Sequence, residues 1–404
     1  MAITEELDSV EKELSVILVR QKASSPEENW NGRFAWYEKM RKESPFTFDE
    51  EAKCWDVFSY DDIETITKNK EVFSSERPIE GERNILNLDP PRHTQLRALV
   101  SKAFTPRELA LWKPRIEQIT ESLITELGAK AEFDLIRDLA YPLPVIVIAD
   151  ILGVPESDRE SFKHWSDILV ASPKASTPEA FAAFRKTRSE SIAQMTDYFL
   201  HIIRKRQANP QSDLISVLVE AEIDGQKLTE SEIQSFCGLL LAAGNETTTN
   251  LIGNTMYALL ESPSRYEQLR KVPSLIPSAI EEGLRYRSPV QAIARVAKED
   301  FDFGGNKVKA GQELILWIGS ANRDETHFPH ADQFLMERTP KNHLSFGKGI
   351  HFCLGAPLAR MEGQIAFEHL VKRYPSLHLA DSFQLNPIVS GFVYGLKSLA
   401  LTAN

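Results

Sequence analysis

One glycine-rich stretch around a cysteine constrains the fold of this chain more than any other feature of its sequence. Residues 346–355 read FGKGIHFCLG, and Pro357 together with the periodic apolar residues after it predicts a helix that begins directly after the stretch. Glycine takes backbone dihedrals that other residues avoid, so the three glycines predict a tight loop that a large planar partner can approach. Cys353 is therefore expected just before a helix N-terminus, where the helix dipole favours a thiolate that can bind a metal.

Two alternative roles for this cysteine follow from its neighbours alone. A single cysteine in a glycine-rich turn is often buried and inert. Cys353 and His351 share one face of an extended chain, an arrangement that also suits a nucleophilic cysteine–histidine pair. The glycines and the helix that follows favour the metal-binding interpretation over both.

The whole chain of 404 residues has an ordinary globular composition, with 42% hydrophobic and 26% charged residues. Its length alone would allow two or three domains. No Gly/Ser-rich or Pro-rich linker, repeat or low-complexity tract divides it, so we expect residues 1–404 to form a single domain, mainly α-helical with a small β region (α+β). The formal net charge of −11 argues against nucleic acid as a general partner.

The N-terminal residues show no pattern of a secretory signal or of a membrane anchor. The chain begins MAITEELD, without the positive segment and cleavage site of a signal peptide, and the longest apolar run there, residues 16–19, is far too short to span a bilayer. Cys54, Cys237 and Cys353 are too scattered for a disulfide framework and fit a reducing compartment. We therefore expect a cytoplasmic monomer without membrane insertion.

The spacing of apolar residues predicts several further elements. Residues 53–60 alternate like a short strand and are followed by a helical pattern, whereas residues 143–152 are almost wholly apolar and indicate a buried helix. Residues 173–178 are bounded by prolines and predict a loop between two helices, interpreted either as a lid or as an ordinary surface loop. A strand region is expected to start at residues 288–290, and a hairpin is expected at residues 388–393.

A long helix is expected over residues 229–262. It opens with a capping box, TESE, and contains no proline as far as Ser262. Its middle, LLLAAGNETTTN at residues 239–250, is an abrupt polar insertion in an otherwise apolar helix, and buried polar groups need a reason. Thr247 is able to bond a backbone carbonyl and open the helix locally. The alternative is a threonine-rich packing face.

Two pairs of charged or titratable residues have helical spacing. Glu282 and Arg285 are three residues apart, which suits an ion pair on one helix face. His93 and Arg97 are four apart after a double proline, and two cationic donors on one face suit a carboxylate or a phosphate. Either pair by itself is also common on a solvated helix face.

The pattern Phe346-x-x-Gly349-x-His351-x-Cys353-x-Gly355 resembles the haem-binding loop of the cytochrome P450 haem-thiolate monooxygenases. The other motifs follow in the order typical of that family, and the resemblance covers nearly the entire chain. It implies the cytochrome P450 fold, in which a long central helix crosses above a haem b and the cysteine loop lies below it. It also implies that Cys353 is the axial ligand of the haem iron.

The resemblance assigns roles to residues outside the loop as well. Glu246 and Thr247 are similar to the family's acid–alcohol pair and are expected to supply protons for oxygen activation. Glu282 and Arg285 resemble its buried salt bridge, completed by Arg338, which is structural rather than catalytic. The residues expected at the haem are Ala243, Gly244, Phe346, Cys353 and Gly355, with His93, Arg97, Arg295 and His351 at the propionates.

The implied reaction inserts one oxygen atom of O2 into a carbon–hydrogen bond and releases the other as water. We expect a lipophilic substrate, such as a steroid, fatty acid or terpenoid, because the residues expected in the pocket are nearly all apolar. They are Ile79, Ile85, Leu169, Leu240, Ala243, Val290, Ile293, Val389 and Phe392.

No flavin or nicotinamide fingerprint is visible, so the two electrons are expected from a separate ferredoxin or flavodoxin with its NAD(P)H-dependent reductase. A basic patch on the cysteine side is the expected docking face, although its residues also suit a solvated surface. The patch comprises Lys102, Arg107, Lys113, Lys348 and Arg360.

Two other haem functions fit the same loop. A peroxide-driven haem peroxygenase is disfavoured because the acid–alcohol pair of Glu246 and Thr247 is intact. A non-catalytic haem-binding sensor would not need that pair. Product formation that depends on electron transfer separates the three functions.

Overall fold

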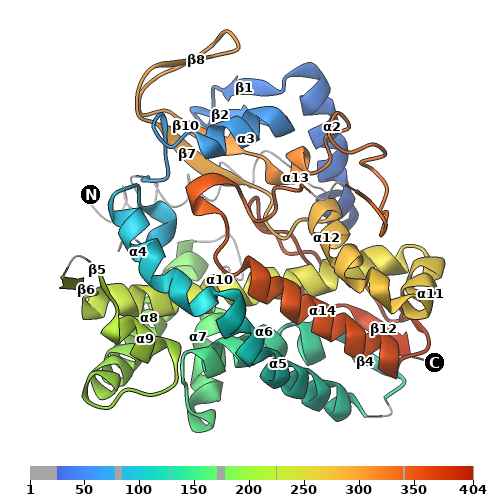
Figure 1. Cartoon of the computed structure of the whole chain (residues 1–404). Coiled ribbons are helices and arrows are strands. Elements are labelled where there is room, and N and C mark those ends of the chain that lie inside the picture. The colour runs from blue at the N-terminus through green and yellow to red at the C-terminus, as the bar shows by residue number, and fades with distance from the viewer. Residues whose placement is uncertain are drawn as a thin grey trace.

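The computed structural model describes residues 25–77, 84–128, 130–170, 178–223, 225–339 and 342–403. Within these ranges helices dominate, and the strands form small sheets (Figure 1). No helix among the described residues carries an apolar stretch long enough to cross a membrane. The α-helices are α2 (Arg33–Glu43), α3 (Tyr60–Lys68), α4 (Arg92–Val100), α5 (Pro106–Leu127), α6 (Pro142–Ile151), α7 (Arg159–Val170), α8 (Pro178–Ala208), α9 (Leu214–Glu220), α10 (Glu230–Leu260), α11 (Pro263–Lys271), α12 (Ile276–Tyr286), α13 (Ile318–Ala321) and α14 (Ala356–Arg373).

The largest sheet in the described part of the chain has the strand order β1-β2-β10-β7-β3. β10 lies parallel to β2 and antiparallel to β7, so the middle of this sheet joins a segment near residue 55 to segments near residues 295 and 315. Its strands are β1 (Phe46–Asp49), β2 (Cys54–Val57), β3 (Phe73–Ser74), β7 (Ile293–Ala297) and β10 (Glu313–Leu316). A second sheet has the order β11-β12-β4, with β4 (Glu132–Asp134), β11 (Leu377–Leu379) and β12 (Ala400–Ala403), and two hairpins pair β5 (Glu222–Ile223) with β6 (Gln226–Lys227) and β8 (Phe301–Phe303) with β9 (Asn306–Val308).

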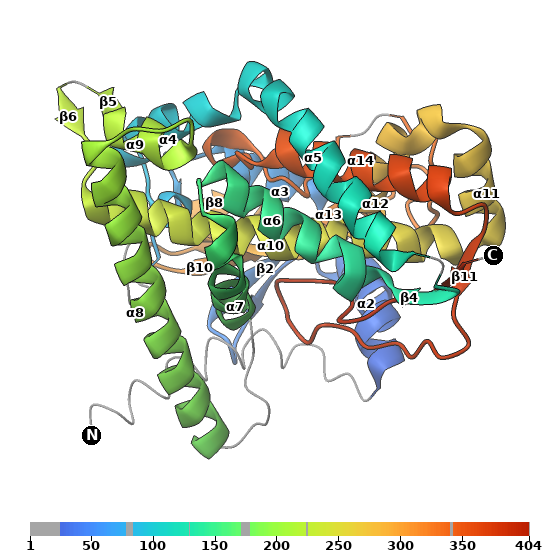
Figure 2. The same ribbon diagram turned by 90° about the horizontal axis from the view of Figure 1, so that it is seen from below.

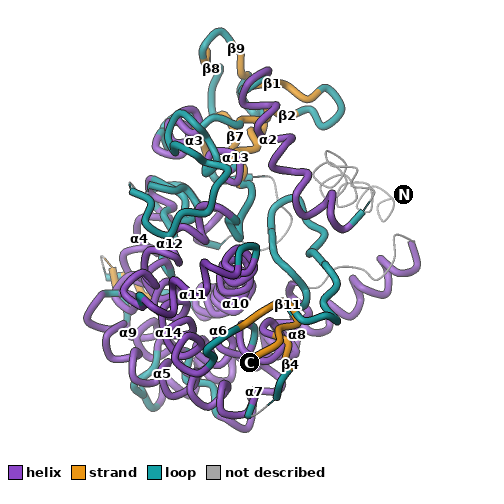
Figure 3. The backbone as a smooth tube through the Cα atoms, turned by 90° about the vertical axis from the view of Figure 1, so that its right-hand side faces the viewer, coloured by secondary structure: helices purple, strands orange, loops and turns teal. Residues whose placement is uncertain are grey.

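The long helix α10 passes through the helical part of the molecule (Figure 2). It packs against α6, α8, α12 and α14, and a view nearly along its axis shows other helices around it (Figure 3). The predicted capping box is present: the Thr229 hydroxyl accepts a hydrogen bond from the amide of Glu232, and the Glu232 carboxylate accepts one from the amide of Thr229. The large apolar cluster around this helix is the main core of the described chain.

The predicted local opening of α10 at Thr247 is wrong. The element is α-helical without interruption from Glu230 to Leu260. The hydroxyl of Thr247 donates to the carbonyl oxygen of Ala243, 2.7 Å away and one turn earlier. A bond of this kind runs along the helix, so the hydroxyl is accommodated without displacing a turn.

Several residues of the polar insertion join α10 to neighbouring segments, as the packing-face alternative proposed. The side-chain amide of Asn245 donates to the Ser166 hydroxyl of α7. The hydroxyl of Thr249 donates to the carbonyl oxygen of Ala140, just before α6. One further turn along, the amide of Asn254 donates to the carbonyl oxygens of two residues outside the helix, each at 2.9 Å. These buried polar groups thus have a role in packing α10 against its neighbours, and this role does not depend on the function of Thr247.

The elements predicted from periodicity are partly confirmed. β2 and α3 lie where a strand and a following helix were expected, and α6 is the expected buried helix. The strand expected from residue 288 is wrong in its start, since β7 begins only at Ile293 and Val290 makes a single bridge with Val393. The hairpin expected at residues 388–393 is confirmed in part: it contains no regular strand, but Pro387 forms an antiparallel bridge with Leu396 and the amide of Ile388 donates to the carbonyl oxygen of Gly395. In the turn between them, the Ser390 hydroxyl accepts hydrogen bonds from two backbone amides. The predicted lid at residues 173–178 lies almost wholly outside the described residues.

Candidate active site

The cysteine loop turns tightly in front of α14, which begins at Ala356. Gly347 and Gly349 have positive φ angles of 70° and 69°, which other residues rarely adopt. The backbone amide of Cys353 donates to the carbonyl oxygen of Phe346 at 2.8 Å and closes the loop. Gly355 has an ordinary φ of −80°, so the strained backbone expected there is wrong. A Cβ atom at Gly355 would meet no described atom within 4 Å, so open space lies beside this glycine, and the absence of a side chain keeps that space free for a ligand.

Two helices fix the loop from its sides. A Cβ atom at Gly349 would lie 2.5 Å from the carbonyl oxygen of Thr67, so the loop approaches the end of α3 closely only because residue 349 is glycine. Arg97 of α4 donates from Nη2 to the carbonyl oxygen of Phe352 at 2.6 Å. The loop therefore has a defined position relative to α3 and α4.

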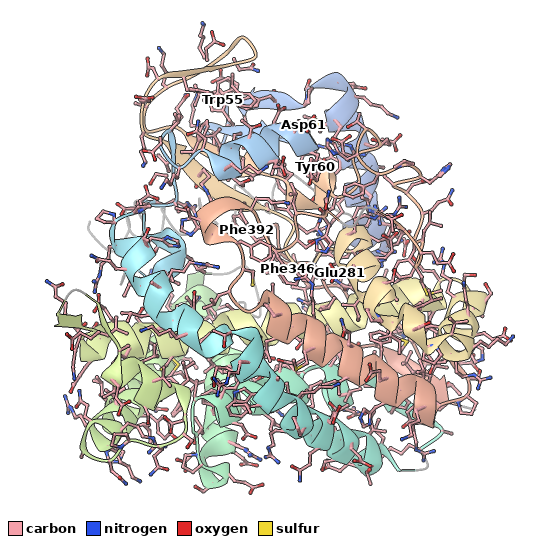
Figure 4. The ribbon with its side chains drawn as sticks, in the orientation of Figure 1. Trp55, Tyr60, Asp61, Glu281, Phe346 and Phe392 are labelled. Carbon is pink, nitrogen blue, oxygen red and sulfur yellow. The ribbon has the colours of Figure 1, made fainter. Side chains whose placement is uncertain are left out.

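A partly buried ionic group supports the loop from the side of α12 and α14. Arg360 of α14 lies over the ring of Phe346, 4.5 Å from its centroid, and pairs with Glu281 of α12. Glu281 also bonds His343, and Figure 4 shows Phe346 and Glu281 next to each other at the centre of the molecule. The sequence prediction missed Glu281, and it placed Arg360 on a docking surface. The sequence features that could have indicated this pair are the second carboxylate directly before Glu282 and the arginine on the first turns of the helix after the cysteine loop.

Cys353 keeps accessible surface, although protein atoms crowd around its sulfur. Burial raises the pKa of the Cys353 thiol above its ordinary value, and the backbone N–H groups of Gly355 and Ala356 and the guanidinium groups of Arg97 and Arg360 only partly oppose this. The backbone N–H groups at the start of α14 do favour the thiolate, as its position before a helix predicts, but desolvation outweighs these donors and the two guanidinium groups. A bound metal cation is what would stabilise the thiolate at this position.

The structure brings the four residues expected at the propionates together, since His93, Arg97 and Arg295 all act electrostatically on His351. The rings of His93 and His351 lie 4.2 Å apart between centroids, and Arg97 follows His93 by one turn of α4. Burial, together with neighbouring positive charges, lowers the pKa of both histidines, that of His351 to about 3. His93 is thus a neutral donor at pH 7 and not the cation that the sequence suggested.

The fourth of these residues, Arg295, lies on β7 and is nearly buried. Its Nη1 donates to the neighbouring carbonyl oxygen of Ala294, and no carboxylate of the described chain forms an ion pair with it. Burial lowers the pKa of Arg295 to about 10, so the guanidinium is still charged at neutral pH, and its charge acts on His351. A buried cation without a paired carboxylate suits an anionic ligand.

The four residues expected at the propionates fit a haem because several of their polar atoms have no partner in the described part of the protein and could bind its carboxylates. Both ring nitrogens of His93 and Nε2 of His351 are buried without a hydrogen-bond partner. With Arg97 and Arg295 they form a group of donors suited to carboxylates, next to a loop that exposes a cysteine sulfur beside the open space at Gly355. A macrocycle with an iron and two carboxylates matches this set.

The middle of α10 places the predicted acid–alcohol pair. Glu246 is largely enclosed by protein atoms, and burial raises the pKa of its carboxyl to about 7. Ala243 is exposed, as expected for a residue next to a ligand. Gly244, in contrast, faces the neighbouring helix: a Cβ atom there would lie 3.2 Å from Ile148 of α6. Its expected role in clearing space beside the haem is therefore wrong, because its small size serves close packing of two helices.

Glu282 and Arg285 form the predicted ion pair, with contacts of 2.8 and 2.9 Å. Arg338 binds the same carboxylate at 3.0 and 3.1 Å, and the Leu335 amide adds a further bond at 2.8 Å. All three charged side chains are nearly fully buried. The group joins α12 to the segment before the cysteine loop and makes no contact that would give it a role in catalysis.

The residues predicted to contact substrate belong to several apolar clusters. Ile85, Leu169 and Leu240 join the large cluster around α10, whereas Ile293 packs against the main sheet's cluster. Phe392 packs in a third cluster, next to Ala292. Neither Ala243 nor Val290 belongs to any of these clusters. Val389 is 59% exposed, which does not support a buried contact with substrate. Ile79 lies outside the described residues.

The fold and the cysteine site together define a haem-thiolate protein. The family model described as Cytochrome P450 matches residues 38–272 and 273–394. Cytochrome P450 109 of Bacillus spizizenii is 48% identical over 367 residues, which cover 91% of this chain and 90% of the relative. The crystal structure of substrate-free CYP109E1 from Bacillus megaterium matches with a TM-score of 0.89 at 47% identity, covering 92% of this chain and 98% of that one.

A second structure of CYP109E1, in complex with testosterone, matches with a TM-score of 0.86 at 46% identity, covering 92% of this chain and 99% of that one. The chain therefore belongs to the cytochrome P450 family. It is a cytochrome P450 monooxygenase, and members of this family carry haem b. The predicted fold, enzyme class and cofactor are confirmed.

Proposed function

We propose that this monooxygenase hydroxylates a lipophilic molecule of the steroid class and binds haem through Cys353. The observation that carries the ligand assignment is the solvent-accessible residue Cys353 on a closed loop beside unpaired ring nitrogens of His93 and His351. Steroids are favoured over fatty acids and terpenoids because the related CYP109E1 has been crystallised with testosterone. When bound, haem supplies the reduction and cleavage of dioxygen, which a thiolate ligand promotes.

In this proposal the chain's own groups move the protons that the reaction consumes. A carboxyl group with a pKa of about 7 can both take up and release a proton at neutral pH, which suits Glu246 as the acid and base of a relay. The Thr247 hydroxyl now donates to the Ala243 carbonyl. Its oxygen is therefore free to accept a hydrogen bond, and the hydroxyl must rotate away from that carbonyl before it can donate its proton elsewhere and take up another.

The electrons come, in the same proposal, from a separate ferredoxin or flavodoxin and its NAD(P)H-dependent reductase. Three members of the expected basic patch already have acidic partners, since Lys348 lies 3.8 Å from Glu64, Lys113 lies 3.8 Å from Glu117, and Arg360 pairs with Glu281. The remaining members, Lys102 and Arg107, are exposed on the segment that leads into α5 and at the start of α5. We place the docking face there.

The axial assignment is tested by the spectrum of the reduced, carbon monoxide-bound protein. Cys353→Ala is expected to lose the red-shifted Soret band of thiolate ligation. Cys54→Ala, which also removes a thiol, is the matched control and is expected to keep the band, because Cys54 lies in β2. Retention of the band in Cys353→Ala would exclude Cys353 as the ligand.

The substrate class is tested by optical titration of the ferric protein with testosterone, a fatty acid and a terpenoid. A spectral shift and a hydroxylated product that depends on electron transfer are expected for the steroid. Turnover with hydrogen peroxide alone would favour a peroxygenase, and a shift without any product would favour a haem-binding sensor.

A further inference from the structure

Two segments that are expected to face substrate meet at one buried glutamine. The backbone amide of Gln291 donates to the carbonyl oxygen of Phe392 at 2.7 Å, and its carbonyl oxygen accepts from the amide of Gly319 at 3.0 Å. The neighbouring residues pair as well, since Val290 forms a bridge with Val393. The positions of Val290 and Phe392 are thus coupled through the backbone of Gln291.

The side chain of Gln291 is fully buried and fixed by partners on both of its polar atoms. Oε1 accepts a hydrogen bond from the hydroxyl of Tyr37 at 3.0 Å, and Nε2 donates to the carbonyl oxygen of Ser288 at 2.6 Å. A Cβ atom at Gly319 would lie 2.0 Å from Oε1, so the amide has no room on that side. The one side-chain donor to Oε1 in the described structure is the hydroxyl of Tyr37.

The helix that carries Tyr37 also reaches the second segment. Arg33 precedes Tyr37 by one turn of α2, and its Nη2 lies 3.5 Å from the carbonyl oxygen of Ser390. The ring of Tyr37 packs in the same apolar cluster as Ala292, Trp317 and Phe392. One face of α2 therefore contacts both segments, and the Cys353 loop is held by other elements, α3, α4, α12 and α14.

We propose that Tyr37 is a positioning residue for substrate, whose hydroxyl fixes Gln291 and thereby places Val290 and Phe392. The proposal rests on the proposed function in one respect, that these two residues face the substrate. Removing the hydroxyl would leave Oε1 of Gln291 buried without a donor, a state that is relieved when the segment moves until Oε1 meets water or another donor. Such a movement changes the substrate contacts and leaves the thiolate loop in place.

The test compares Tyr37→Phe with Tyr266→Phe. Tyr266 of α11 is a similarly buried tyrosine, whose hydroxyl donates to the carbonyl oxygens of Leu370 and Tyr374 at the end of α14, outside both segments. Both variants lose one buried hydroxyl, so a general loss of stability affects both. In both, the thiolate band of the reduced, carbon monoxide-bound protein is expected to be unchanged.

The first readout is hydrogen–deuterium exchange of the holoprotein, which needs no substrate. Faster exchange of peptides that contain the amides of Gln291, Gly319 and Tyr394 is expected in Tyr37→Phe, because the bonds from these amides join the two segments and α13. Tyr266→Phe is expected to leave those peptides unchanged. Unchanged exchange in Tyr37→Phe, or an equal increase in both variants, would overturn the proposal.

The second readout uses testosterone: optical titration measures its affinity, and product analysis measures the distribution of hydroxylated products. Tyr37→Phe is expected to weaken binding about 5- to 10-fold, the effect of one lost buried hydrogen bond, and to alter the product ratio. In a Phe392→Ala background the same change is expected to add little, because both act on one segment. Additive effects would overturn the proposal. If the unmodified protein does not respond to testosterone, the steroid assignment fails and the exchange readout alone decides the role of Tyr37.

Discussion

Arg360 of α14 reaches Glu281 of α12 with both ends of its guanidinium, Nε at 2.6 Å from one carboxylate oxygen and Nη2 at 2.9 Å from the other. Burial alone would raise the pKa of Glu281, but the hydrogen bonds from His343 and Arg360 lower it to about 2. Because a lowered carboxyl pKa stabilises the folded protein only while the group is ionised, this contribution is complete above the ordinary value of 4.5 and is lost as the pH falls toward 2.

Glu281→Gln is therefore expected to lower the free energy of unfolding at pH 7 by about 3 kcal/mol and to flatten its dependence on pH between 4.5 and 2. Urea unfolding at a series of pH values measures both effects. Glu267→Gln, which removes an exposed ion pair with Lys271, is the control and is expected to change nothing measurable. An unchanged acid profile in Glu281→Gln would mean that the Arg360 pair does not stabilise the loop.

Glu282→Gln is expected to destabilise the protein by about 3–5 kcal/mol, because Arg285 and Arg338 would then be buried without a carboxylate. The midpoint of thermal unfolding and the fraction of protein that binds haem measure this. Glu43→Gln removes the partner of Lys39 in an ion pair whose two side chains are both exposed, and is expected to cost about 1 kcal/mol or less. Equal losses in the two variants would contradict the structural role of the buried group.

Thr247→Ala is expected to keep haem binding, substrate binding and reduction, and to divert electrons from product to hydrogen peroxide. The reason is that the variant loses the hydroxyl that passes protons on. Nicotinamide consumed, peroxide released and product formed are measured with the same redox partners. Thr248→Ala, a change at the next and buried threonine, is the control. Full coupling in Thr247→Ala would mean that another group carries the proton.

Glu246→Gln is expected to slow turnover, since an amide can hydrogen-bond but cannot relay a proton at neutral pH. Because the pKa of Glu246 lies near 7, the turnover rate of the unmodified enzyme should show an inflection near that pH. The inflection is expected to disappear in the variant. A pH–rate profile with the same inflection in both proteins would assign it to a different group.

Charge reversal on the proposed docking face should slow reduction by a ferredoxin. Arg107→Glu is expected to reduce the rate of the first electron transfer, and raised salt should reduce the rate of the unmodified protein, because exposed charge pairs are screened. Lys186→Glu makes a similar charge change on the exposed part of α8 and is the control. Similar rates for both variants would remove the patch from the proposal.

The parts of the site that were predictable from the sequence are those made by neighbours in the chain. The loop before α14, the capping box at Thr229 and the pair of Glu282 with Arg285 all depend on spacings of a few residues. Side-chain direction around a helix was not predictable, so Gly244 was assigned to the haem although it faces Ile148. Contacts between distant segments, such as Tyr37 with Gln291, leave no local pattern at all.

The pKa values show a similar limit. Spacing and residue type suggested a cationic His93, and that expectation fails because desolvation depends on how much of the folded protein surrounds the group. The position of Cys353 before a helix indicated donors that favour the thiolate, but not the burial that raises its pKa. The same effect, which no spacing predicts, gives Glu246 a pKa suited to its proposed role.

The parallel pairing of β2 with β10 has a consequence for how the chain acquires its structure. Cys54 lies opposite Glu313 in this register, so the first strands have no partner on their inner edge until more than half of the chain has left the ribosome. Contacts of such long range slow folding, and an unpaired strand edge is open to association with other chains while it waits. Nascent chains that end before β10 are therefore expected to need chaperones, and a stop codon placed there should yield aggregated protein.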